Sequence, residues 1–159
     1  MRHHVDIERL GVMAGDIERY LSDVEELLGR GERWRTDKWE FYATSMLLFS
    51  LINRVLDLGG ELVMELKLGI PHHYRDIFAI LARNGMIGPD LADDLGRLVY
   101  YRNLLSHEYQ RVTEEDIGAI LGQVGGIDRF LTAVRMISRE EGMQVKVGPL
   151  SGREVLQKR

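Results

Sequence analysis

The chain has 159 residues, of which 45% are hydrophobic and 29% are charged, as expected for a globular protein with one domain. It contains no cysteine, which excludes disulfides, thiol nucleophiles and thiolate metal sites and fits a reducing compartment such as the cytoplasm. The formal net charge of −4 counts against a general affinity for nucleic acid, although a phosphate group responds to the local field rather than to the total charge.

Residues 6–28 are expected to form the first helix. Their apolar side chains recur at steps of three and four residues, which places one apolar stripe on one face of a helix: Leu10, Met13, Ile17, Tyr20, Val24 and Leu27. Gly29 and Gly31 are helix stop signals, so the segment GRGERWRTDKWE is interpreted as a polar loop.

The second helix is expected over residues 37–68, and it is apolar on several faces. One stripe contains Trp39, Tyr42, Met46, Phe49, Leu56 and Val63, and other faces carry Phe41, Leu48, Ile52 and Leu62. Such a helix is typical of the centre of a bundle or of a surface that faces a partner subunit. Asn53 falls on the first stripe, and Asp57 follows it on the same side. Gly59 and Gly60 indicate a kink or a close helix crossing, and Pro71 is expected to end the helix.

Three further helices are expected. A short one covers residues 74–83, and a longer one begins near Pro89 with the stripe Leu91, Leu95, Leu98, Arg102 and Leu105. The last begins at Thr113 and keeps its apolar stripe as far as Ile137. The sequence thus predicts an all-α protein, an antiparallel bundle of four main helices plus one short helix. We expect a helical domain over residues 5–141 and a C-terminal tail over residues 142–159, with either a short strand at Gln144–Val147 or disorder.

Arg102 occupies a position that Leu98 and Leu105 mark as facing inward. A charge at such a position must be paired, or it must line a cavity or interface that admits an anion. The structural explanation is an ion pair with an acid on a neighbouring helix, and Asp57 and Asp76 are the candidates. The functional explanation is an anion site, in which the same two acids are supporting residues.

His107 follows Arg102 by five residues, so on an ideal helix their side chains point about 140° apart. They converge only if the helix ends or loosens between Leu105 and His107, and the Ser106 hydroxyl can assist by bonding to the backbone. If the backbone is extended after that point, Tyr109 points the same way as His107. The structural alternatives are a histidine that stabilises the helix dipole and a tyrosine that caps the end of the bundle.

An arginine and a histidine together can cleave RNA without a metal. The imidazole, with an unperturbed pKa of about 6.5, transfers the proton of the 2′-hydroxyl or of the leaving oxygen. The planar guanidinium stabilises the charge that develops on the phosphoryl group. DNA lacks the 2′-hydroxyl and should resist this reaction.

The stretch RNLLSHEY at residues 102–109 resembles the signature of the HEPN superfamily of helical ribonucleases. More narrowly it resembles the HepT toxins of HepT–MntA toxin–antitoxin pairs, whose motif is arginine, four residues, histidine, one residue, tyrosine. Arg102, His107 and Tyr109 match that motif, and Asn103 follows the arginine as the family prefers. INRVLDLGGELV resembles the central helix of the family, and HHYRDIFAILARNGMIGPDLADDLGRLVYYRN resembles its run into the motif helix. The resemblance covers residues 5–138.

The resemblance implies a homodimer in which two copies of the Arg–His pair line one cleft. It implies an RNA substrate, and as partner a small MntA-like nucleotidyltransferase, the antitoxin, which adenylylates Tyr109 and silences the nuclease. A nucleotide there would add negative charge and bulk beside Arg102 and His107. The chain departs from the family pattern at Ser106, where an aliphatic residue is usual, and at Gly59 and Gly60, where alanine is common.

Other functions have weaker support. The histidine pairs at residues 3–4 and 72–73 lack the spacing of a metal site, and no segment has the GxxxxGK pattern of a phosphate loop. We therefore expect neither a metal nor a cofactor. No apolar run approaches the roughly 20 residues of a membrane span, so we expect no membrane contact and a cytoplasmic protein. Two alternatives stay open: a non-catalytic helical binding partner and substrate of a nucleotidyltransferase, and a dimeric structural module held by an interhelical ion pair.

Overall fold

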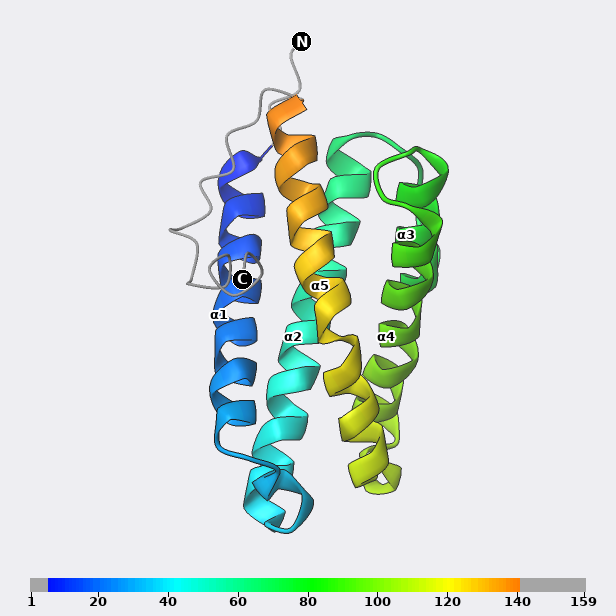
Figure 1. Cartoon of the computed structure of the whole chain (residues 1–159). Helices are drawn as coiled ribbons and strands as arrows, with labels where there is room; N and C mark the ends of the chain where they lie inside the picture. The colour runs from blue at the N-terminus through cyan, green and yellow to red at the C-terminus, as the bar shows by residue number, and fades with distance from the viewer. Residues whose placement is uncertain (1–5, 141–159) are drawn as a thin grey trace.

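The computed structural model describes residues 6–140, which form a bundle of α-helices. In chain order its elements, including the 3-10 turns η1 and η2, are α1 (Ile7–Gly29), η1 (Arg33–Arg35), α2 (Lys38–Glu65), α3 (Tyr74–Arg83), α4 (Pro89–His107), η2 (Tyr109–Arg111) and α5 (Glu114–Glu140). Figure 1 shows α1 and α2 running in opposite directions, as do α4 and α5. The predicted all-α bundle of four main helices and one short helix is confirmed. The expected tail at residues 142–159 and the histidine pair at 3–4 lie outside the described residues.

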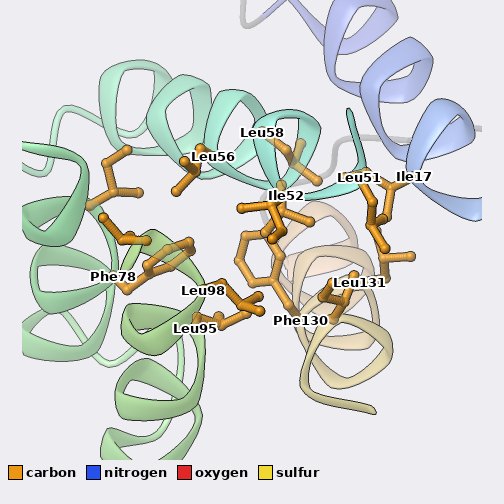
Figure 2. Packing of buried hydrophobic residues seen from close by; sticks show 14 of the residues in the cluster. Ile17, Leu51, Ile52, Leu56, Leu58, Phe78, Leu95, Leu98, Phe130 and Leu131 are labelled. Carbon is orange, nitrogen blue, oxygen red and sulfur yellow. The ribbon is translucent and has the colours of Figure 1, made fainter. Parts of the chain in front are cut away.

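α2 is the central helix, since it contacts α1, α3, α4 and α5. It begins where the Asp37 carboxylate accepts hydrogen bonds from the backbone N–H groups of Trp39 and Glu40, which satisfies two of the donors that a helix start leaves unpaired. Its buried residues belong to one hydrophobic cluster with residues of every other α-helix, and Figure 2 labels members such as Ile17, Ile52, Phe78, Leu98 and Phe130. Phe78 of α3 and Phe130 of α5 join the same cluster edge to face, with ring centroids 5.8 Å apart.

The close crossing expected at Gly59 is present, between α2 and α3. A Cβ atom at Gly59 would lie 2.8 Å from the γ2 methyl of Ile77 and 3.3 Å from the Phe78 ring, distances too short for carbon atoms. α2 ends earlier than expected, at Glu65 rather than at residue 68 before Pro71. The backbone turns left-handed at Lys67, whose φ is 54°, so the chain leaves the helix before proline can act on it.

One other expectation for this half of the chain was wrong, namely the polar loop after α1. The loop after α1 is not wholly polar, because η1 turns Trp34 into the core, where it is 2% exposed. The first stripe of α2 is not uniformly buried either: Leu56 and Val63 are buried, whereas Trp39, Tyr42 and Met46 are exposed. The N-terminal half of α2 therefore presents an aromatic surface to the outside.

Among the described helices, α5 alone is long and apolar enough to cross a membrane by length and composition, with a mean hydropathy of 1.2 in its most apolar window. Its apolar side chains are nevertheless used within the bundle, since Ile117, Ile120 and Phe130 are at most 1% exposed. The hydropathy of α5 is that of a helix that packs in the core of a bundle.

Candidate functional site

Arg102 lies in the last two turns of α4 and is half-buried. Its Nε donates a hydrogen bond to Oδ1 of Asn53 in α2 at 3.1 Å, and its Nη1 donates to Oδ1 of Asn103 at 3.3 Å. The guanidinium carbon lies 4.9 Å from the ring centroid of Tyr74 and 5.9 Å from that of Phe49. Neutral amides and aromatic rings thus hold the guanidinium in place without cancelling its charge.

Neither acid proposed as an ion-pair partner of Arg102 has that role. Asp57 accepts a hydrogen bond from Arg54 at 3.3 Å, and Asp76 accepts hydrogen bonds from the backbone N–H groups of His73 and His72 at the start of α3. Those backbone bonds, with His73 contributing most, lower the pKa of the exposed Asp76 carboxyl. Among the ion pairs of the described residues none includes Arg102, so the structural explanation by Asp57 or Asp76 was wrong.

The other arginines of this segment are neutralised. Arg97 pairs with Asp94 at 3.0 Å, and Arg111 pairs with Glu108 at 3.5 Å. Arg102 is therefore the arginine of residues 97–111 that keeps its charge available to an anion.

His107 is the last residue of α4 and is exposed to solvent. The helix continues through it, and the N–H of Glu108 still bonds to the carbonyl of Leu104 at 3.0 Å. The expected loosening between Leu105 and His107 is therefore absent. Ideal helical geometry then points Arg102 and His107 about 140° apart within one chain, and no hydrogen bond joins the two side chains in the described part of the molecule.

Tyr109 opens the 3-10 turn η2, one residue after α4 ends, so the extended backbone that would point Tyr109 the same way as His107 is not present. Its side chain is 66% exposed. It lines a groove of about 440 Å³ together with Ser106 and with Phe41, Tyr42, Met46 and Phe49 of α2; we call this the α2–η2 groove. Tyr109 is thus not buried as a cap of the bundle end, and its phenol is open to modification.

A second, larger hollow of about 660 Å³ is lined in part by His72, His73, Tyr74, Arg75 and Asn103. Arg102 lines neither cavity itself, but its guanidinium lies against one ring from each. Those rings are Phe49 of the α2–η2 groove and Tyr74 of this hollow.

Sequence reasoning missed three residues that position Arg102, namely Asn53, Phe49 and Tyr74. Asn53 carried a signal, because it is the polar residue on an otherwise apolar stripe of the central helix. Tyr74 carried none, since its ring reaches Arg102 only through the packing of α3 on α4. In residues 6–140 no group of three or more histidine, aspartate or glutamate side chains is placed to hold a metal ion.

Comparison with known proteins gives consistent matches. The family described as "Ribonuclease HepT-like" matches residues 17–134. The mRNA nuclease HepT of Shewanella oneidensis is 28% identical over 96 residues, which are 60% of this chain and 72% of that protein.

Two solved structures share the fold. One is a tri-AMPylated HEPN toxin of Shewanella oneidensis in complex with an MNT antitoxin, with a TM-score of 0.74 and 23% identity over 82% of this chain and 98% of that one. The other is YutE from Bacillus subtilis, a cytosolic protein of unknown function, with a TM-score of 0.77 and 21% identity over 92% of this chain and 96% of that one.

The neutral surroundings of Arg102 predict a small effect on stability when it is removed. Arg102→Ala should lower the free energy of unfolding by about 1 kcal/mol, because it loses part-exposed hydrogen bonds to amides. Arg54→Ala is the matched control and should lower the free energy of unfolding by about 2 kcal/mol. The half-buried Asp16 then loses a charged partner at 2.7 Å, in an ion pair that solvent partly screens. Urea unfolding of both variants measures the difference. A loss of 3 kcal/mol or more from Arg102→Ala would instead indicate a structural ion pair.

Proposed function

Because the chain belongs to the family of HepT-like ribonucleases, we propose that it is a metal-independent endoribonuclease and the toxin of a toxin–antitoxin pair. The observation that carries this function is Arg102, a half-buried guanidinium that neutral amides and aromatic rings hold in place without an ion pair among the described residues. Such a group binds a phosphate without first having to break an ion pair. The exposed His107 on the same helix supplies proton transfer.

The reaction we propose is an internal transfer at phosphorus. The 2′-oxygen of the RNA attacks the neighbouring phosphorus as His107 removes its proton, and the bond from phosphorus to the 5′-oxygen of the next nucleotide breaks. Water gives a proton to that leaving oxygen, and the imidazolium of His107 returns its proton to solvent, so each phosphate needs one histidine. The products are a 2′,3′-cyclic phosphate and a 5′-hydroxyl, and Arg102 stabilises the extra charge on the phosphoryl oxygens in between.

The geometry of α4 supports a homodimer with a shared cleft. Since the helix is regular through His107, one chain points its Arg102 and His107 in directions about 140° apart. A twofold arrangement of two motif helices can place Arg102 of one subunit opposite His107 of the other. We therefore propose that each phosphate is held by an arginine and a histidine from different subunits. Sedimentation of the full chain at micromolar concentration should give a dimer, and a monomer would contradict this arrangement.

Tyr109 is the proposed point of control by a MntA-like nucleotidyltransferase antitoxin. One solved structure with this fold is a tri-AMPylated HEPN toxin in complex with an MNT antitoxin, and another is a toxin–antitoxin with AMP-PNP. In this chain the Tyr109 oxygen would attack the α-phosphorus of ATP, which forms an oxygen–phosphorus bond and expels pyrophosphate, while the phenol proton passes to a base. Two observations support this role: Tyr109 is exposed, and it follows His107 by two residues. A phosphate and nucleoside added to Tyr109 would therefore occupy space beside the proposed catalytic pair.

Modification of Tyr109 is predicted to be specific and to silence cleavage. Incubation of the wild-type chain with a MntA-like nucleotidyltransferase and ATP should raise its intact mass by one or more adenylyl groups. Tyr109→Phe should show no increase, because it lacks the phenol oxygen, and Tyr100→Phe serves as control since Tyr100 is equally exposed on α4. An adduct that persists in Tyr109→Phe would place the modification elsewhere. An adduct on a chain that never cleaves RNA would favour the non-catalytic binding partner, which the net charge of −4 also suggests.

Cleavage should require the motif and no metal. In excess chelator the wild-type chain is expected to cut single-stranded RNA, whereas His107→Ala should be slower by about 100-fold or more, the usual contribution of general acid–base catalysis. Arg102→Ala should lose activity to a similar degree, and Arg97→Ala, which removes an exposed arginine paired with Asp94, should not. Rates are measured from gel-resolved products, with an all-deoxy strand as the uncut reference. Equal cutting by wild type and His107→Ala would end the enzymatic proposal.

A further inference from the structure

The α2–η2 groove is an aromatic cavity whose use the cleavage reaction does not explain. Phe41, Tyr42 and Phe49 contribute three rings and Met46 a flexible thioether, and the Phe41 and Tyr42 rings meet edge to face with centroids 6.0 Å apart. Tyr42 is 56% exposed and Met46 is 63% exposed. Rings and a thioether of this kind offer stacking surfaces to a flat ligand, and about 440 Å³ is within the usual range of small-ligand pockets.

The positive charge of Arg102 beside the groove indicates that such a ligand carries a negative group. The Arg102 guanidinium lies over Phe49, 5.9 Å from the ring centroid, so an anion held by Arg102 is next to the aromatic wall. Tyr109 also lines the groove, and Ser106 adds a hydroxyl. A flat apolar group attached to a phosphate fits both features, which describes a nucleotide.

We propose that the α2–η2 groove is a nucleobase site, in which a base stacks on the α2 rings while its phosphate lies on Arg102. The proposal deepens the ribonuclease function and rests on it for the role of Arg102 as a phosphate ligand. Two nucleotides can supply the base: one in the RNA strand at the point of cleavage, or the adenylyl group on Tyr109 after modification. In the second case the adenine fills the site that would bind a base of the RNA, so the modification would inhibit cleavage by competing with the substrate.

A second copy of the chain is the other conceivable occupant of an apolar groove. It is disfavoured because a hollow of about 440 Å³ matches a small ligand better than the surface of another helical bundle. A nucleotide also brings negative charge to Arg102, whose hydrogen bonds among the described residues go to neutral amides.

The site is tested by binding, without any need for cleavage. The probes are a short oligodeoxyadenylate, which lacks the 2′-hydroxyl and cannot be cut by the proposed route, and an abasic strand of equal length. The wild-type chain should prefer the oligodeoxyadenylate. Tyr42→Ala should weaken its binding by about 5- to 100-fold, the range for loss of one stacking partner, and leave the abasic strand unchanged. Tyr100→Ala, which removes a similarly exposed tyrosine outside the groove, should change neither.

A second pair of variants shows whether weaker binding by Tyr42→Ala comes from the groove or from local misfolding of α2. Met46→Ala should also weaken the base-dependent part of binding, whereas Met136→Ala, which alters an exposed methionine on α5, should not. Equal affinity of the wild type for both strands would overturn the proposal. It would also be overturned if Tyr42→Ala converted a dimer to a monomer and left base-dependent binding intact, because the groove would then be a contact between copies.

The two sources of the base are separated by adenylylation of Tyr109. If the adduct seats its own adenine, the modified chain should lose base-dependent binding of oligodeoxyadenylate, and the modified Tyr42→Ala chain should show no further loss. Unchanged binding after modification assigns the groove to the RNA strand alone, and either result supports a nucleobase site. If the wild type binds bases in this way but cuts no RNA, the ribonuclease function fails while the nucleobase site stands. If the wild type cuts RNA but Tyr42→Ala binds the oligodeoxyadenylate as tightly as the wild type, the nucleobase site fails while the ribonuclease function stands.

Discussion

The guanidinium of Arg102 is held by uncharged groups, and the rest of the site depends on that. Asn53 and Asn103 accept its hydrogen bonds, and Tyr74 and Phe49 lie against it. The nearby acids that could have neutralised it have other partners, because Asp57 pairs with Arg54 and Asp76 caps the start of α3. A half-buried arginine held in this way keeps its charge for an anion, and the proposed function assigns the phosphate of the RNA as that anion.

The regular hydrogen bonding of α4 through His107 constrains how Arg102 and His107 can act together. Because the helix holds its hydrogen bonds through His107, Arg102 and His107 diverge within one chain, and the proposed site takes one of them from each subunit. In that proposal, symmetric association creates a site that neither subunit contains alone. The proposed control through Tyr109 follows from the same arrangement. The turn η2 begins one residue after α4 ends, so a group added there would lie at the edge of the shared cleft and beside the α2–η2 groove.

Much of the fold was predictable from helical periodicity, and the position of the motif came from its spacing. The failures have physical causes. Trp34 entered the core through a 3-10 turn, and α2 ended at a left-handed Lys67, because loop conformation depends on tertiary contacts that no period reveals. The partner of Arg102 was sought among acids, since an inward arginine usually pairs with one. Asn53 showed on the sequence as a polar residue on an apolar stripe, whereas the ring of Tyr74 reached the site through packing of α3 on α4.

The sharing of one phosphate by two subunits is tested most directly by mixing two inactive variants. Arg102→Ala and His107→Ala chains are unfolded together, refolded at equal concentration and assayed for RNA cleavage in chelator. If each site takes its arginine and its histidine from different subunits, half of the dimers are mixed and each contains one intact site. The mixture should then recover about a quarter of wild-type activity. If both residues of a site came from the same chain, every site would carry one substitution, and the mixture would stay as inactive as its parents.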